Sequence, residues 1–213
     1  MPLLPTLIET IRIRNGVAPF WGLHLRRLAG SCKALGVPFP GVLKVPEGGV
    51  DRVHRLTVGR SGADVTEREV GSTAPVRLVT SHVPHPLYLH KTTERVAFDR
   101  ALEEAHRAGA DDALLLSPRG EVAEATIWCL FWWEREGLCA PALEIGILPG
   151  VSRMRIDQIA GPIQPRRVPL AALARRSLLL SNAVRGIVEV SFLDDVAVPR
   201  DPRTAMLQAR FWP

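Results

Sequence analysis

Among the residues that could do chemistry, one lysine stands out because the chain uses this residue type so rarely. Of 27 basic residues only three are lysines, Lys33, Lys44 and Lys91, so arginine supplies nearly all the positive charge. A desolvated lysine can lose its proton and attack a carbonyl to form a Schiff base, whereas a guanidinium stays charged. Lys91, in the stretch His90-Lys-Thr-Thr, is therefore a candidate nucleophile. A solvated lysine at the start of a helix is the alternative interpretation.

A carboxylate lies in an apolar stretch further along the chain. The turn Pro118-Arg-Gly separates two predicted strands, and Glu124 falls inside the second, which runs from Glu121 to Trp133. A buried carboxylate is costly unless it is paired. Glu124 is thus expected either to face an exposed edge or to have a cationic partner.

Two further segments could bind an anion. Leu148-Pro-Gly precedes a predicted helix beginning at Val151 or Ser152, and the exposed amides of such a helix start attract phosphate groups. The alternative interpretation is that Leu148-Pro-Gly only marks the start of a helix and binds no anion. Asn182 and Arg185 follow a predicted buried strand, Leu178 onwards, where ligand-binding groups often lie in mixed α/β folds.

Composition limits the possible classes of protein. With 213 residues, 46% of them hydrophobic, the chain can form one large or two small domains. It has no apolar run of about 18 residues and no signal-peptide pattern at its start, so we expect a cytoplasmic protein without a membrane partner. The net charge of +5 comes from scattered arginines, which favours an anionic small substrate over nucleic acid. Three cysteines without C-x-x-C spacing suggest neither a disulfide framework nor a metal site.

The predicted elements indicate a mixed α/β chain of two domains. A strand up to the turn Asn15-Gly16 is followed by a helix that Gly36 ends, and by alternating strands at 53–59 and 76–82. The segment with Pro84 and Pro86 resembles a linker, and an amphipathic helix runs from Glu94 to Gly109. We therefore expect a smaller N-terminal α/β domain at 1–83, a linker at 84–90 and a larger C-terminal domain at 91–213.

The order of these features resembles the fold-type IV pyridoxal-phosphate enzymes, the class IV aminotransferase family, which contains branched-chain and D-amino-acid aminotransferases and aminodeoxychorismate lyase. The matching stretches cover nearly the whole chain: Ile8-Glu-Thr-Ile-Arg, His24-Leu-Arg-Arg-Leu, His90-Lys-Thr-Thr-Glu-Arg, Gly109-Ala-Asp-Asp-Ala, Gly120-Glu-Val-Ala-Glu-Ala-Thr, Leu148-Pro-Gly-Val-Ser-Arg and Ser181-Asn-Ala-Val-Arg-Gly. The resemblance implies a two-domain fold like that of D-amino-acid aminotransferase, with Lys91 in the larger domain.

The resemblance also implies a role for each matching residue. Lys91 would bind the aldehyde of pyridoxal 5'-phosphate and later transfer a proton, and Glu124 would pair with the protonated ring nitrogen. The cofactor phosphate would be held by the following residues: Arg27, Ile127 through its backbone, Val151, Ser152, Asn182 and Ala183.

Within the family, His90-Lys-Thr-Thr and Ser181-Asn-Ala-Val-Arg-Gly are most similar to aminodeoxychorismate lyases. This similarity implies a lyase that converts 4-amino-4-deoxychorismate into 4-aminobenzoate and pyruvate in folate biosynthesis. Thr10 would relay a proton to the departing pyruvate, and Arg12 and Arg185 are predicted to bind the substrate carboxylates. A homodimer is implied, with aminodeoxychorismate synthase as a further partner.

Two other functions are open at this point. A class IV aminotransferase acting on a branched-chain or D-amino acid would use the same cofactor residues, and only the substrate pocket would differ. A catalytically inactive binding subunit, using its basic surface on nucleic acid, belongs to a different class and would bind no cofactor.

Overall fold

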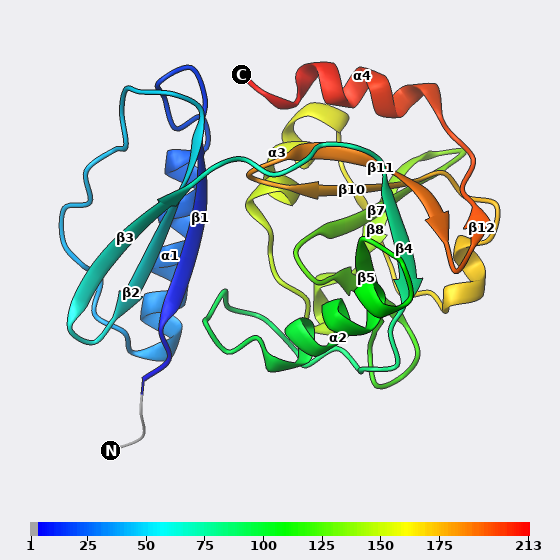
Figure 1. The fold of residues 1–213 in the computed structure, drawn as a ribbon, viewed down its shortest axis with the longest axis horizontal. Helices are drawn as coiled ribbons and strands as arrows, with labels where there is room; N and C mark the ends of the chain where they lie inside the picture. The colour runs from blue at the N-terminus through cyan, green and yellow to red at the C-terminus, as the bar shows by residue number, and fades with distance from the viewer. Residues whose placement is uncertain (1–3) are drawn as a thin grey trace.

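The computed structural model describes residues 4–213, which form two sheets side by side (Figure 1). The smaller sheet contains three antiparallel strands in the order β1 (Leu7–Ile13), β2 (Arg52–Gly59) and β3 (Gly62–Arg68). The larger sheet is built from β4 (Val76–Thr80), β5 (Asp112–Leu116), β6 (Val122–Ala125), β7 (Cys129–Glu134), β8 (Gly137–Pro141), β9 (Gln164–Arg166), β10 (Leu178–Asn182), β11 (Gly186–Leu193) and β12 (Val196–Ala197). Its strand order is β6-β5-β4-β11-β10-β7-β8-β9, and β12 pairs with β11. The fold is thus a mixed α/β structure, as predicted.

The helices cover these sheets. They are α1 (Trp21–Leu35), α2 (Val96–Arg107), α3 (Val151–Ala160) and α4 (Pro202–Phe211), with two short 3-10 turns, η1 (Leu143–Ile145) and η2 (Leu170–Leu173). The predicted stop of α1 is confirmed, because Gly36 adopts the left-handed conformation that glycine tolerates best (φ +66°). None of the helices within residues 4–213 is long and apolar enough to cross a membrane.

The smaller sheet has one apolar face and one face that is available for chemistry. Leu7 and Ile11 point toward α1, where they pack with Leu28 and Leu56. Because side chains alternate across a strand, the residues between them, including Thr10, point to the opposite face. That face is turned toward the larger sheet.

The core of the larger sheet lies on both of its faces. Neighbouring residues of β7 illustrate this, because Trp132 packs in one apolar cluster and Phe131 in the other. The cluster of Phe131 is closed by α3 and α4, while α2 packs against β5 through Phe98 and Ala101. The cluster of Trp132, on the other face, is formed by strand residues with Leu173 of η2, so the strands are buried on both faces and give the site a rigid base.

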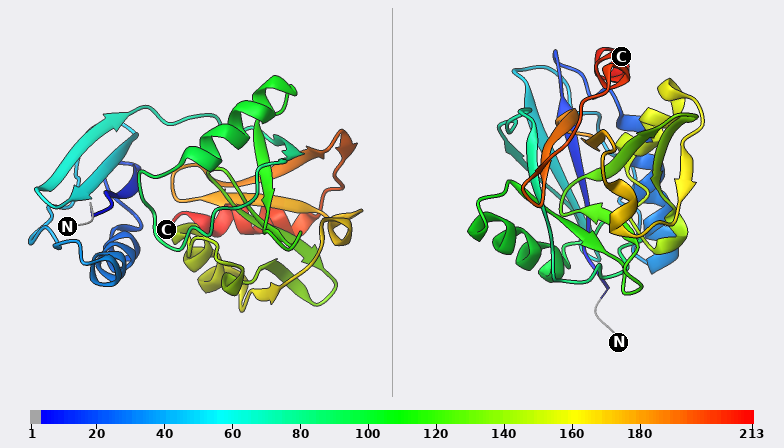
Figure 2. Two further views of the ribbon diagram at one scale, coloured as in Figure 1. Left: turned by 90° about the horizontal axis from the view of Figure 1, so that it is seen from below. Right: turned by 90° about the vertical axis from the view of Figure 1, so that its right-hand side faces the viewer.

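The crossing between the two sheets lies earlier than predicted. β4 was expected in the N-terminal domain, but it pairs with β11 and β5 of the larger sheet, so the chain crosses at residues 69–75 rather than at 84–90. Figure 2 shows the smaller sheet and α1 as one lobe beside the larger sheet. The segment 84–90 instead returns toward β1, where Leu7 forms a bridge with Thr92.

The long apolar strand predicted from Glu121 to Trp133 is two strands. β6 pairs with β5 at one end of the larger sheet, whereas β7 pairs with β10 and β8. The break at residues 126–128 is fixed by buried Asp112, whose Oδ1 accepts hydrogen bonds from the amide and hydroxyl of Thr126 at 3.0 and 2.7 Å. This break brings the end of β6 toward the smaller sheet.

Candidate functional site

A cavity of about 150 Å³ is lined by residues from both sheets. It contains every site residue predicted from the sequence except Arg12, namely Thr10, Arg27, Lys91, Glu124, Ile127, Val151, Ser152, Asn182, Ala183 and Arg185. These residues come from six separate stretches of the chain, so the fold gathers them into one place.

Lys91 is held in this cavity by its own backbone. Its carbonyl accepts the amide N–H of Ile8 in β1 at 2.8 Å. The following residue, Thr92, is fixed by the hydroxyl of Tyr88, which donates to the Thr92 carbonyl at 2.6 Å and accepts from the Thr92 amide at 2.7 Å. The lysine therefore projects from an anchored backbone that is attached to the smaller sheet.

The surroundings of Lys91 make its amine more nucleophilic. Desolvation, followed by the positive charges of Arg27 and Arg95, lowers the pKa of Lys91 to about 8, although Glu9 and Glu124 oppose the shift. A lysine with a pKa near 8 is partly neutral at physiological pH, and only the neutral amine attacks a carbonyl. The solvated-lysine interpretation does not fit this environment.

Glu124 is buried at the end of β6, where a histidine ring and a backbone amide contact it. Its Oε1 lies 2.9 Å from Nε2 of His85 and accepts the amide N–H of Leu148 at 3.1 Å. Its second oxygen, Oε2, has no hydrogen-bond partner among residues 4–213. The carboxylate therefore lines the cavity with one oxygen free.

The start of α3 forms the anion-binding end of the cavity. The first amides of a helix have no acceptor within the helix, and those of Val151 and Ser152 have no other backbone acceptor in the described part of the chain. The hydroxyl of Ser152 donates to the Ser181 carbonyl at 3.1 Å. Opposite them, Oδ1 of Asn182 accepts the amide of Val184 at 3.0 Å and so fixes the turn that contains Ala183.

Arg27 reaches the same end of the cavity from α1, but its fork is already engaged. Its Nε and Nη2 donate to the two carboxylate oxygens of Glu9 at 2.9 and 2.6 Å, and His24 contacts the same carboxylate at 2.6 Å. Burial alone would raise the pKa of Glu9, but Arg27 and His24 lower it to about 2. Glu9 thus positions Arg27, and a phosphate would be bound by the remaining Nη1 rather than by both arms of the guanidinium.

Three arginines at the mouth of the cavity have no carboxylate partner. Arg55, Arg68 and Arg185 all line it, and none forms an ion pair among residues 4–213. Burial and the neighbouring charge of Arg68 lower the pKa of both Arg55 and Arg185. Arg185 also lies over the ring of Trp128, 5.3 Å from its centroid. Uncompensated like charges that face one cavity favour an anionic ligand.

Arg12, predicted to bind substrate, does not line the cavity. It lies further along β1 than Thr10, and its guanidinium forms an ion pair with Asp51. The prediction is therefore not supported, because a local partner already neutralises this arginine. Its place on the sheet face is taken by Arg55, which lies directly opposite Thr10 in the β1–β2 register.

The sequence also left several site residues unassigned. No sequence pattern gave a role to His85, which contacts Glu124, or to Tyr88 and Arg95, which line the cavity. A signal for Glu9 was present, because it shares a strand face with Leu7 and Ile11 and so should be buried with a cation. No comparable signal marks Arg55, since its position depends on the pairing of strands 45 residues apart.

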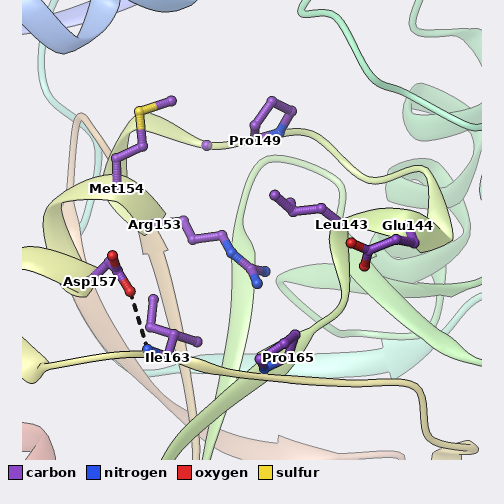
Figure 3. A pocket seen from close by; sticks show the side chains of 9 residues that line it. Leu143, Glu144, Pro149, Arg153, Met154, Asp157, Ile163 and Pro165 are labelled. Carbon is purple, nitrogen blue, oxygen red and sulfur yellow. Dashed lines mark hydrogen bonds between the residues drawn. The ribbon is translucent and has the colours of Figure 1, made fainter.

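A second cavity, of about 320 Å³, is lined by residues at the start of α3 and by the segments around Leu143 and Ile163 (Figure 3). Two of its charged side chains are occupied by backbone partners: Arg153 donates to the Pro141 carbonyl at 2.7 Å, and Asp157 accepts the Ile163 amide at 3.1 Å. It contains no lysine, histidine or cysteine. We therefore assign the chemistry to the cavity around Lys91.

The residues of that cavity fit pyridoxal phosphate. Its amine of lowered pKa, at Lys91, suits an aldehyde, and the free Oε2 of Glu124 suits a protonated ring nitrogen. The open amides of α3 and Nη1 of Arg27 suit a phosphate. The cavity thus offers a matching group for each of the three functional parts of pyridoxal phosphate: the aldehyde, the ring nitrogen and the phosphate.

Comparisons with known proteins point to one family. The sequence profile described as "Amino-transferase class IV" matches residues 63–192, more than half of the chain. A protein of Schizosaccharomyces pombe (strain 972) named "Putative aminodeoxychorismate lyase" is 27% identical over 150 residues. That match covers 62% of this chain and 65% of the relative, so the chain spans less than two thirds of its length.

Solved structures show the same fold. A Legionella pneumophila protein named "Putative 4-amino-4-deoxychorismate lyase" is 23% identical, covers 97% of this chain and 91% of its own, and has a TM-score of 0.82. A branched-chain aminotransferase of Thermoproteus uzoniensis, solved with norvaline, is 21% identical, covers 97% and 84%, and has a TM-score of 0.85. A hypothetical aminotransferase of Mycobacterium tuberculosis in a PLP-bound form is 21% identical, covers 99% and 92%, and has a TM-score of 0.84.

Proposed function

The chain belongs to the amino-transferase class IV family, a family of pyridoxal-phosphate-dependent enzymes, and on that premise we propose that it is a lyase acting on 4-amino-4-deoxychorismate. The products would be 4-aminobenzoate and pyruvate. The observation that carries the proposal is the set of unpaired arginines, Arg55, Arg68 and Arg185, at the mouth of the Lys91 cavity.

The charge at the mouth fits this substrate better than a simple amino acid. The proposed substrate has two carboxylates at separate positions, and each needs a cation when it leaves water. An arginine fork binds a carboxylate through two parallel hydrogen bonds. Three free guanidinium groups therefore match two carboxylates, whereas an amino acid with an apolar side chain would leave most of this charge uncompensated.

The residues of the chain would divide the reaction between them. When bound, pyridoxal phosphate supplies an aldehyde for the substrate amine and a ring that accepts electrons. Glu124, through Oε2, would hold a proton at the ring nitrogen, and Arg27 with the amides of Val151 and Ser152 would hold the phosphate. Because these contacts fix the cofactor at both ends, its reactive carbon stays near Lys91.

The proton steps would use Lys91 and Thr10. The neutral amine of Lys91 is a suitable base for the proton on the substrate carbon that carries the amine, since its pKa is close to 8. The hydroxyl of Thr10, which lines the cavity, would pass a proton to the methylene carbon of the departing enolpyruvyl group. One proton is removed and one is added, so the substrate divides into its two products without another reactant.

The test is a product assay with the purified protein, pyridoxal phosphate and 4-amino-4-deoxychorismate, without any 2-oxo acid. We expect 4-aminobenzoate and pyruvate in equal amounts, and we expect both to disappear in Lys91→Ala. Conversion of amino acids that depends on an added 2-oxo acid, with no 4-aminobenzoate formed, would contradict the lyase proposal.

A class IV aminotransferase is the second candidate. Apolar side chains also line the cavity, among them Ile8, Trp128 and Val184, and they could contact the side chain of a branched-chain or D-amino acid. The same cofactor residues would serve this reaction. Assays with and without the 2-oxo acid distinguish the two candidates directly.

A further inference from the structure

We propose that His85 is a positioning residue for the cofactor, acting through Glu124. The inference rests on the proposed pairing of Glu124 with the ring nitrogen of pyridoxal phosphate. Both side chains are buried, with 2% of His85 and 5% of Glu124 exposed, and Nε2 of His85 lies 2.9 Å from Oε1 of Glu124. A histidine at this distance must either donate to the carboxylate or face it without a proton between them.

The other ring nitrogen decides between these two arrangements. Nδ1 of His85 accepts the amide N–H of Leu87 at 3.3 Å, so Nδ1 carries no proton. In the neutral ring the proton is then on Nε2, and Nε2 donates to Glu124. The backbone of residue 87 thus selects the tautomer that supplies a hydrogen bond to the carboxylate.

The backbone of Leu87 adopts an unusual conformation to make this contact. Its φ angle is +58°, in the left-handed region that non-glycine residues seldom occupy. The turn is packed against Gly146, where an added Cβ would lie 2.7 Å from Cδ2 of Leu87. The ring of His85 is further held edge-on by Phe98, with 5.5 Å between centroids. Strain of this kind persists where the surroundings fix it, and it often marks a functional site.

These contacts give the two oxygens of Glu124 different roles. The His85 ring and the Leu148 amide both donate to Oε1, which leaves Oε2 as the oxygen available to the cavity. Two donors on one oxygen hold the carboxylate in one orientation, with Oε2 directed to the cavity. A carboxylate held in this orientation would keep a proton on the ring nitrogen of the cofactor.

Two substitutions distinguish the loss of the hydrogen bond to Glu124 from the loss of the histidine ring as such. His85→Gln keeps a donor near the position of Nε2, whereas His85→Asn keeps a polar group near Nδ1 for Leu87 but is too short to reach Glu124. Both are neutral and polar, so they differ chiefly in the hydrogen bond to Oε1. His82→Asn, at an exposed histidine of the same segment, controls for the loss of a histidine. Lys91 and Arg153, whose charges act on Glu124, are unchanged in all three variants, as is Cys129, whose thiol pKa is raised by burial and by Glu124.

The readout is nitrogen NMR of pyridoxal phosphate labelled at the ring nitrogen, bound to each protein at neutral and mildly alkaline pH. We expect a protonated ring nitrogen in the wild type, in His85→Gln and in His82→Asn, and a loss of protonation in His85→Asn. The dissociation constant of the cofactor should rise about tenfold in His85→Asn alone, the usual effect of losing one hydrogen bond to a charged group. A wild-type nitrogen signal in His85→Asn, or equal changes in Gln and Asn, would overturn the proposal.

A measurement on the cofactor-free protein keeps this test separate from the proposed function. Nitrogen NMR of the His85 ring should show a proton on Nε2 and none on Nδ1 whether or not the cofactor binds. If the wild type has this tautomer but binds no pyridoxal phosphate, the proposed function is wrong, while the assignment of the His85 hydrogen bond still holds. A proton on Nδ1 would refute the positioning role of His85 by itself.

Discussion

At the inner end of the cavity Arg27 is bound by Glu9 through two hydrogen bonds, whereas Arg55, Arg68 and Arg185 at the mouth have no carboxylate partner in the part of the chain that the structure describes. The inner end is buried and closed by the start of α3. The two ends of the cavity therefore suit two different kinds of anion. A resident phosphate needs a site that is formed in advance, and a passing substrate needs free charge that attracts it and is neutralised only while it is bound.

The first prediction concerns the inner end and has the largest expected effect. Arg27→Met removes the partner of a buried carboxylate, and breaking such a pair costs about 3–5 kcal/mol of the free energy of unfolding. The dissociation constant of pyridoxal phosphate should rise at least about a hundredfold as well. Denaturant unfolding and cofactor titration measure the two effects. Arg26→Met, at the exposed neighbour on the same helix, is the matched control.

If Arg27→Met bound the cofactor as well as Arg26→Met does, the inner end would not be the phosphate site. The comparison between the two ends would then lose its basis, even if the variant were less stable.

The second prediction is the pH dependence that follows from Glu9. Its pKa is 4.5 in the unfolded chain and about 2 in the folded protein, so the folded state binds fewer protons between these values. The corresponding stability, about 3 kcal/mol, is present above pH 4.5 and is lost as the pH falls toward 2. Unfolding free energies measured across this range should show the loss, and Glu9→Gln should show a smaller pH dependence. The same slope in both proteins would mean that Arg27 and Glu9 are not coupled.

The third prediction concerns the arginines at the mouth of the cavity, and its expected effect is smaller. Arg55→Met or Arg185→Met should raise KM for the dicarboxylate substrate by about 10- to 100-fold, since a hydrogen bond to a charged group contributes about 1.5–3 kcal/mol. Cofactor affinity and the free energy of unfolding should change little, because neither side chain has a carboxylate partner among residues 4–213. Arg60→Met, at an exposed arginine beside the β2–β3 turn, is the control. Steady-state kinetics and cofactor titration on the same samples provide the comparison.

An equal loss of cofactor affinity in the mouth variants would contradict the division between the two ends. It would show that the free arginines belong to the cofactor site.

Local patterns in the sequence predicted most of the fold, and the family resemblance supplied most of the cavity residues. The αL stop at Gly36, the α3 start at Val151 and the buried strand from Leu178 are all present, because capping and periodicity act over a few residues. Lys91 and Glu124 were found from a rare residue type and from a misplaced charge, and family resemblance supplied their proposed roles.

What the sequence could not provide was long-range pairing. Arg55 comes to the cavity because β1 and β2 pair in one register, and Arg12 is removed from it because Asp51 lies nearby. The partner of Glu124, His85, comes from a segment 39 residues away. The split of the predicted strand at 126–128 depends on Asp112, which also lies on another strand. Such contacts depend on the assembled fold and not on any local pattern.

The central claim is that Lys91 is the residue that binds the cofactor aldehyde, and the chain's three lysines make it directly testable. The purified protein would be incubated with pyridoxal phosphate, reduced with borohydride, digested and mapped by mass spectrometry. Lys33 and Lys44, both exposed, serve as internal controls. We predict that the phosphopyridoxyl mass is found on the peptide containing Lys91 and is absent from it in Lys91→Ala. Labelling of Lys33 or Lys44 alone, or no labelling of any peptide, would contradict the account.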